Sequence, residues 1–182
     1  MIEGWMAGVN LRLAHHKTEA VMISNRKAAL EAKIIVGGQV IVSKRSVKYL
    51  SVMADNRLNF TRHVDFACGK ASTAVTALSK IMPNCFGPSS SKRRLMVSVA
   101  MSVLRYGAPV WAPTLDSKCN QACLNKVFRL LALRVVCGYR TISLDAIEVI
   151  AAMIPICILL GEAIEYHRQR SVRGARDRAG LY

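Results

Sequence analysis

A change in hydrophobic period at Lys48-Tyr49-Leu50-Ser51-Val52 constrains the fold of this chain most strongly. Before this stretch, short β-branched runs alternate with turns, and after it apolar residues recur every three or four positions. A period near 2 indicates strands, whereas a period near 3.6 indicates helices. The sequence therefore predicts an α+β fold, in which a small antiparallel hairpin or sheet edge is followed by a mostly α-helical bundle.

The strand signals lie in the first 55 residues. Residues 34–36 and 39–42 are β-branched runs on either side of Gly37-Gly38, a pattern typical of a hairpin with a primed turn. We also expect one strand at residues 20–24 and another at residues 47–53. Three or four short strands are too few to form an independent domain with its own core.

The remaining residues predict five segments of helix. A stripe of apolar residues indicates a helix that starts near Asn59 and stops at Pro83. Ser89-Ser90-Ser91 offer N-caps for a second helix, and its apolar residues 95–104 are expected to be buried. A third helix is expected at residues 118–137 with Gly138 at its C-cap, and Ser143 is expected to cap a fourth. Pro155 separates the fourth from a last helix that ends near residue 170.

The charge of +15 and the isoelectric point near 10 indicate a polyanionic partner, with nucleic acid ahead of an anionic membrane surface. Residues 60–182 carry 17 basic and 7 acidic residues, a net charge of +10. Three cations in the first turn of the second helix oppose the macrodipole, which favours a ligand role. Aromatic residues are few, so backbone contact with a duplex fits better than base stacking. The candidate phosphate contacts are Lys92, Arg93, Arg94, Arg105, Lys126, Arg129 and Arg134; the alternative is a solvated cationic face.

No catalytic centre is predicted within the chain. Its 11 acidic residues do not cluster, and no Asp-Asp or Asp-x-Asp pair could hold two metal ions. The sequence contexts of turn or cap residues are found at Asp55, Asp65, Asp116 and Asp145. Cys119 and Cys123 lack a second ligand pair for zinc, so we expect no metal site. The six cysteines are scattered through helical patterns without a secretory signal, so we expect reduced thiols in the core. Because no signal peptide and no membrane-length apolar run is visible, we expect an intracellular protein, nuclear or cytoplasmic and not secreted.

Several short motifs occur in a characteristic order. Residues 11–19 have the pattern L-x-L-x-x-x-K-T-E, residues 48–52 read K-Y-L-S-V, and residues 55–63 have the pattern D-x-x-L-x-F-x-x-H. Further along come Arg93-Arg94-Leu95, the run L-R-Y-G-A-P-V-W at 104–111, and Y-R-T-I-S at 139–143. This series resembles the reverse transcriptases of non-LTR retrotransposons, in particular the LINE-like, site-specific elements of arthropods. The resemblance covers the chain up to about Arg170.

The resemblance implies a domain organisation: residues 1–54 as the end of a polymerase palm and residues 55–170 as a helical thumb and connection. The Arg- and Gly-rich composition of residues 171–182 predicts a basic frayed tail. It implies that Lys17 lies near the incoming nucleotide and that a strand with Lys48, Tyr49 and Leu50 supports the primer terminus. It also implies that the thumb helices grip the template–primer duplex. Ser51 stands where the family has glycine.

In the family, the fingers and the Tyr-x-Asp-Asp hairpin belong before the position of Met1. Mg²⁺ is therefore implied for the intact family enzyme, with no cofactor in this chain. We expect a fragment of an RNA-directed DNA polymerase that binds the backbone of an RNA–DNA or DNA duplex and is inactive without the missing fingers and palm. The alternatives are a stand-alone basic helical nucleic-acid-binding module and a non-functional retroelement relic.

Overall fold

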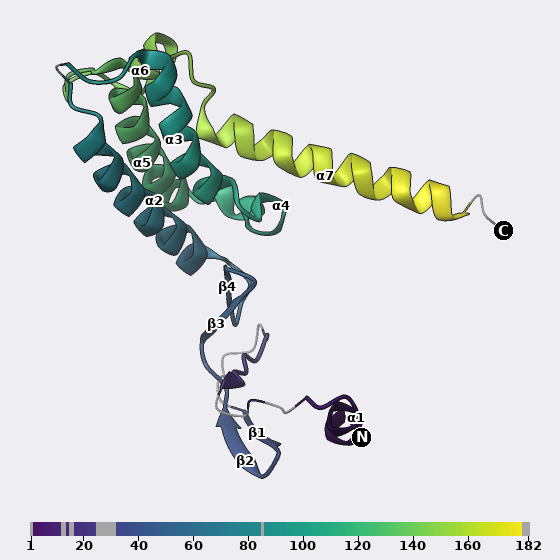
Figure 1. Cartoon of the computed structure of the whole chain (residues 1–182). Coiled ribbons are helices and arrows are strands. Elements are labelled where there is room, and N and C mark those ends of the chain that lie inside the picture. The colour runs from purple at the N-terminus through teal and green to yellow at the C-terminus, as the bar shows by residue number, and fades with distance from the viewer. Residues whose placement is uncertain (1, 12–13, 15–16, 25–31, 85, 180–182) are drawn as a thin grey trace. The chain divides into compact units, whose positions relative to one another are not determined.

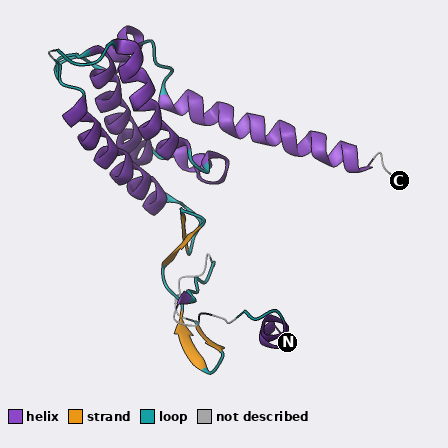
Figure 2. Ribbon diagram, viewed as in Figure 1, coloured by secondary structure: helices purple, strands orange, loops and turns teal. Residues whose placement is uncertain are grey.

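The computed structural model describes residues 2–11, 14, 17–24, 32–84 and 86–179. The chain divides into two compact units, Met1–Asn59 and Phe60–Tyr182, and each is described by itself (Figure 1). Strands occur in the first unit and the long helices in the second (Figure 2). This is the α+β fold that the change of period predicts. The division falls after residue 59, whereas the predicted boundary falls after residue 54.

Among its described residues, unit 1 has two separate hairpins after a short helix, α1 (Ile2–Gly8). Strands β1 (Lys33–Val36) and β2 (Gln39–Val42) pair antiparallel, with Ile34 opposite Ile41. Gly37 and Gly38 join them with φ of 55° and 79°. Positive φ at both central residues defines the primed turn expected from the Gly-Gly pair, so this hairpin prediction is confirmed.

The other two strand predictions for unit 1 are wrong. In residues 20–24, Val21 alone forms a ladder contact, an isolated parallel bridge with Lys44. The backbone of this segment bonds to two different parts of the chain, so no continuous ladder forms. Lys44 donates its N–H to the oxygen of Ala20 (2.7 Å), and Ser24 donates to the oxygen of Asn56 (3.0 Å). Residues 47–53 are not one strand, because the chain reverses within them.

A second hairpin occupies the place of that single strand. Strands β3 (Ser46–Tyr49) and β4 (Val52–Asp55) pair antiparallel, with Tyr49 opposite Val52. Leu50 and Ser51 form the two-residue turn with φ of 44° and 67°. Left-handed backbone favours glycine, so a glycine in place of Ser51 would suit this turn.

Replacing Ser51 by glycine is expected to stabilise the β3–β4 hairpin by about 0.5–1 kcal/mol, because glycine removes the left-handed strain. Backbone amide hydrogen exchange of β3 and β4 measures the change, and protection should rise roughly 2- to 5-fold. Ser46→Gly is the matched control: within a strand glycine costs conformational entropy, so protection should fall. Equal effects of the two substitutions would contradict the turn assignment.

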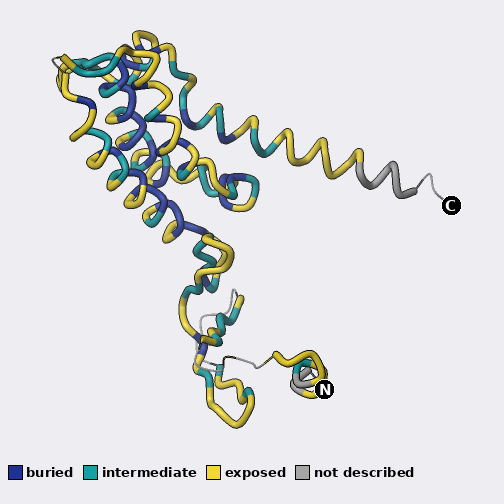
Figure 3. Tube along the Cα trace, in the orientation of Figure 1, coloured by how far each residue is buried: buried dark blue, intermediate teal, exposed yellow. Residues whose placement is uncertain are grey.

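Unit 2 is a bundle of helices. Helices α2 (Thr61–Ile81), α3 (Ser90–Arg105) and α5 (Lys118–Val136) pack against one another, and α6 (Leu144–Ala151) packs on α5. A short helix, α4 (Ala108–Trp111), and a 3₁₀ turn, η2 (Ala112–Asp116), contact α7 (Ile156–Ala179). The buried face of each long helix points into this bundle (Figure 3). Its largest fully buried apolar side chains include Trp111, Phe128, Met82, Leu104, Leu124 and Leu131.

The helix ends agree only in part with their sequence signals. The Ser143 hydroxyl accepts a hydrogen bond from the N–H of Ala146 (3.3 Å), which confirms the predicted cap of α6. Ser89 occupies the N-cap position of α3, but its side chain makes no capping bond. At the end of α5, Cys137 and not Gly138 has the left-handed conformation (φ 56°). Helix α7 continues to Ala179, past the predicted end near residue 170.

The prediction that residues 95–104 are buried on all sides is wrong. Val97, Ala100 and Leu104 are buried, whereas Leu95 is 72% exposed and Val99 is 59% exposed. Only one face of α3 meets the bundle, so its apolar residues are divided between core and surface.

Within the described residues, no single helix is both long and apolar enough to cross a membrane, although two bent helix pairs, Ser90–Arg105 with Ala108–Asp116 and Leu144–Ala151 with Ile156–Arg173, pass the same test together.

Candidate nucleic-acid interface

In unit 1, the structure brings three of the predicted site residues together at the turn of the second hairpin. Lys48 and Tyr49 end β3, and Leu50 begins the turn. All three are exposed, with Tyr49 at 69% and Leu50 at 71%. Lys17 is also exposed, in a separate turn where its N–H donates to the oxygen of Ala14 (2.9 Å). The K-Y-L-S-V motif at residues 48–52 thus forms an exposed hairpin turn and not a single strand.

The prediction that Arg93 contacts phosphate is wrong, because this residue is only 2% exposed. Its Nε donates to the oxygen of Pro88 (2.8 Å), and its Nη2 donates to the oxygen of Pro83. Its Nη1 donates to the oxygens of Met82 (3.4 Å) and Arg134 (3.3 Å). These carbonyls lie after the end of α2 and in the last turn of α5, where helices leave carbonyl groups without intrahelical donors. Arg93 therefore stabilises the bundle and does not present its charge to a ligand.

Gly87 lies against this arrangement. A Cβ at Gly87 would collide with the oxygen of Pro83 and the guanidinium of Arg93. Only glycine allows the loop between α2 and α3 to pass this close to the arginine.

Arg94 and Arg129 also donate to backbone carbonyls. Arg94 is exposed, and its Nη2 donates to the oxygen of Ala151 (2.7 Å), the last residue of α6. Arg129 is half-buried, and its guanidinium donates to the oxygens of Arg140 and Ile142 in the loop after α5. Cations at carbonyl ends of helices are favourable. The sequence shows the unfavourable cations of α3, but it does not show that they serve the ends of other helices.

The other predicted phosphate contacts in unit 2 are exposed but do not form one cluster. Lys92 and Arg105 lie near opposite ends of α3, separated by roughly 20 Å at 1.5 Å per residue, and Lys126 lies on α5. Arg134, the last of the candidate phosphate contacts predicted from the sequence, is half-buried. Further exposed cations of this unit are Arg62, Lys70, Lys80, Lys118, Arg140, Arg168, Arg170 and Arg173. Positive charge is therefore spread over many helices.

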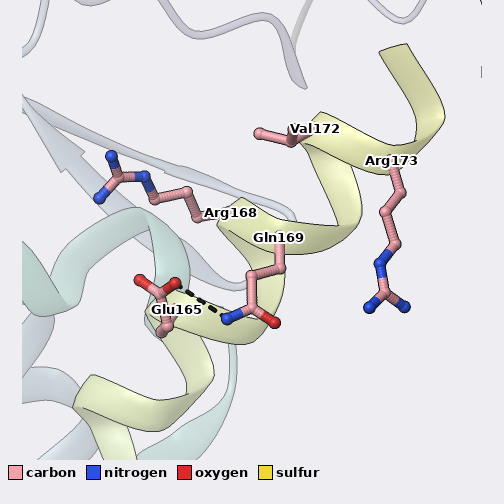
Figure 4. A pocket seen from close by; sticks show the side chains of 5 residues that line it. All are labelled: Glu165, Arg168, Gln169, Val172 and Arg173. Carbon is pink, nitrogen blue, oxygen red and sulfur yellow. Dashed lines mark hydrogen bonds between the residues drawn. The ribbon is translucent and has the colours of Figure 1, made fainter. Parts of the chain in front are cut away.

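Helix α7 carries cationic residues that the sequence reasoning missed as a site. Arg168, Arg170 and Arg173 lie beyond the part of the helix that packs on the bundle, and all three are exposed. A shallow hollow of about 430 Å³ is lined there by Glu165, Arg168, Gln169, Val172 and Arg173 (Figure 4). The arginine-rich composition from residue 168 to 178 was the signal that could have identified this segment.

The described residues do not fit a magnesium or zinc site. No group of three His, Cys, Asp or Glu side chains in this part of the chain could hold a metal ion. The buried carboxylate of Asp55 accepts hydrogen bonds from the N–H groups of Arg57 (3.1 Å) and Asn59 (3.0 Å), which confirms its interpretation as a turn residue.

The five described cysteines are free thiols. Cys68 is buried on α2. Its pKa is raised mainly by this burial, and to a smaller extent by a hydrogen bond with Cys123 of α5. Cys119 is exposed, so the expectation of core thiols does not hold for every one of them.

His63 is a core residue at the start of α2. It is 3% exposed, and its ring lies 5.4 Å from the ring of Trp111, centroid to centroid, at 58°. Burial lowers the pKa of His63 from its ordinary value of 6.5, because the charged form loses solvation. The histidine of the D-x-x-L-x-F-x-x-H motif is therefore a neutral packing residue.

Unit 2 is expected to lose stability as the pH falls below 6.5, the ordinary value for His63. The unfolded state takes up a proton there while the folded state resists it, so the unfolded state binds more protons and the free energy of unfolding decreases. Urea unfolding between pH 7 and pH 5 measures this slope. His63→Gln should flatten it, whereas His167→Gln, at an exposed position of α7, should not. Unchanged slopes in both variants would contradict the role of His63.

The fold and its exposed charge define a basic α+β chain with a helical bundle. Comparison with known proteins finds that this chain is similar to proteins of retrotransposable elements. The chain is 27% identical over 159 residues to a 115 kDa protein in the type-1 retrotransposable element R1DM of Drosophila melanogaster. It is 25% identical over 153 residues to a retrovirus-related Pol polyprotein from the type-1 retrotransposable element R1 of Bradysia coprophila. It is 26% identical over 160 residues to a Pol polyprotein from element R1 4 of Nasonia vitripennis.

These alignments cover 86%, 83% and 84% of this chain, but only 15%, 15% and 40% of the three relatives. The chain thus corresponds to less than half of each relative's length. No family model matches the chain. No solved structure matches it either.

Proposed function

We propose that the chain is a retrotransposon-derived fragment of a reverse transcriptase, comprising the end of the palm and the thumb, that binds a template–primer duplex and does not polymerise alone. The observation that carries this proposal is the similarity over 83–86% of the chain to proteins of R1 retrotransposable elements, two of which are Pol polyproteins. The order of the K-T-E, K-Y-L and D-x-x-L-x-F motifs agrees with it. The net charge of +10 on residues 60–182 supports contact with phosphates.

The exposed surface of unit 1 supports a contact with further parts of a polymerase. Hairpin β1–β2 exposes Ile34 and Ile35 on β1 and Val40 and Val42 on β2, at 47%, 73%, 60% and 48%. Successive strand residues point to opposite faces, so this hairpin presents apolar side chains on both faces. Apolar strands of this kind are normally covered by another layer. We propose that the fingers and remaining palm of the polymerase supply this cover, inside the cell in the nucleus or cytoplasm.

Duplex binding is tested by fluorescence anisotropy with a labelled RNA–DNA template–primer at several salt concentrations. We expect log affinity to fall linearly with log salt, and the triple variant Lys92→Ala, Arg105→Ala, Lys126→Ala to reduce the slope by about 0.9 for each phosphate that is no longer neutralised. Lys44→Ala is the control, since Lys44 is already paired with Glu19 (2.6 Å). A salt slope unchanged by the triple variant, or primer extension by the purified chain with Mg²⁺ and dNTPs, would contradict the proposal.

The second candidate is a stand-alone nucleic-acid-binding module. It is favoured by the fact that unit 2 has its own core and could therefore fold without the polymerase. A segment of residues 60–182 that folds and binds duplex as tightly as the whole chain would support this candidate. If the chain is a non-functional relic, neither the whole chain nor the segment of residues 60–182 should bind duplex.

A further inference from the structure

Helix α7 extends well beyond the contacts that hold it. Ile156 and Leu160 are buried against the bundle, whereas every side chain from Glu165 to Arg173 is exposed (Figure 3). A helical segment without an apolar face to bury gains little from tertiary packing, and an isolated segment of this length is marginal in water. A ligand that contacts this part of α7 would stabilise it.

The charge of the segment defines the ligand. Arg168, Arg170 and Arg173 make no ion pair within the described part of the chain, and the sequence adds Arg176 and Arg178. Glu165 is held by a hydrogen bond from the side-chain amide of Gln169 (3.0 Å; Figure 4). The segment therefore suits a polyanion. Val172 is its one large aliphatic residue between positions 165 and 173, which argues against an interfacial membrane helix, since such helices present a broad apolar face.

An aromatic ring shares one face of α7 with two of these arginines. Tyr166, Arg170 and Arg173 follow the i, i+4, i+7 spacing that places residues on one stripe. Together with Gln169 they line one shallow hollow of about 140 Å³. Tyr166 is 67% exposed. Arg168 belongs to a different face, and its side chain points away from that of Arg173 (Figure 4).

We propose that this stripe binds single-stranded nucleic acid, with one base stacked on the Tyr166 ring and phosphates contacted by Arg170 and Arg173. An exposed aromatic ring beside cations is the arrangement that binds single strands, because the base faces of a duplex are already stacked on one another. The inference deepens the proposed function and rests on it: the bundle contacts the duplex, and α7 contacts an unpaired strand.

The test uses the full chain and labelled single-stranded RNA and DNA oligonucleotides of 12 nucleotides in anisotropy titrations. Tyr166→Ala should weaken single-strand binding roughly 5- to 150-fold, the range for loss of one stacked base, and Tyr166→Phe should retain binding. Arg170→Ala and Arg173→Ala should each lower the salt slope by about 0.7. Lys44→Ala is the control and should change neither quantity, because Lys44 is already paired with Glu19. Arg168→Ala should lower the salt slope less than Arg173→Ala does. Far-UV circular dichroism checks that each variant keeps its helix content.

Three outcomes would overturn this inference. They are unchanged single-strand affinity in Tyr166→Ala, equal losses from Arg168→Ala and Arg173→Ala, and losses in Tyr166→Ala that are as large on a blunt-ended duplex as on a single strand. If the unaltered chain binds the duplex but these variants do not affect single strands, only the role of α7 fails. If it binds neither nucleic acid, the proposed function fails as well.

Discussion

Replacing Arg93 by methionine is expected to lower the free energy of unfolding of unit 2 by about 3–5 kcal/mol. The guanidinium donates to the carbonyl oxygens of Met82, Pro83, Pro88 and Arg134. Methionine fills much of the same volume but donates no hydrogen bond, so these carbonyls lose a buried partner. Arg93→Lys should also be costly, because an ammonium group cannot reproduce the planar fork of donors.

Urea unfolding followed by circular dichroism at 222 nm measures this loss as a lower midpoint. Lys92→Met is the matched control, since Lys92 is the exposed neighbour on the same turn, and its effect should stay within about 0.5 kcal/mol. The order should be reversed for duplex binding. Lys92→Met should weaken binding directly, whereas a conservative change at Arg93 should affect binding only by lowering the stability of unit 2. An Arg93→Met protein that unfolds at the midpoint of the unaltered chain but loses nucleic-acid binding would contradict the structural role.

Trp111→Ala is expected to destabilise unit 2 by about 3–5 kcal/mol, the usual cost of truncating a buried aromatic residue. Trp111 is fully buried beside His63, and its indole Nε1 donates to the oxygen of Tyr106 (2.9 Å). Trp111→Phe keeps most of the packing but loses that hydrogen bond, so a smaller cost of about 1–2 kcal/mol is expected.

Thermal and urea unfolding of both variants test the order of these effects. Val110→Ala serves as control, because Val110 precedes Trp111 in α4 but is 56% exposed, and its effect should be within about 0.5 kcal/mol. If Trp111→Ala were no more destabilising than Val110→Ala, the buried indole of Trp111 would not be the stabilising core residue that we infer.

Features set by local chemistry could be predicted from the sequence. The Gly37-Gly38 turn, the Ser143 cap and the break at Pro155 each depend on a few adjacent residues. The turn at Leu50-Ser51 was missed because neither residue favours positive φ, so the pattern read as a continuous strand. The exposed face of α3 was missed because Leu95 and Val99 have the same chemistry as core residues.

The candidate site shows the limit more clearly. Composition correctly indicated an excess of exposed positive charge, but it could not separate cations that meet solvent from those used inside the bundle. Arg93 bonds to carbonyls 11 and 41 residues away in the sequence, and such partners have no local signal. Tyr166 became a candidate only when the helix placed it in the same hollow as Arg170 and Arg173.

The contacts of Arg93 also determine how unit 2 can open. One side chain of α3 holds the loop after α2 and the last turn of α5 at the same time, so neither segment can leave without breaking a bond of the shared guanidinium. Regions linked in this way tend to unfold together. The α2–α3 loop should therefore belong to the most slowly exchanging, cooperative part of the unit, although surface loops usually open first.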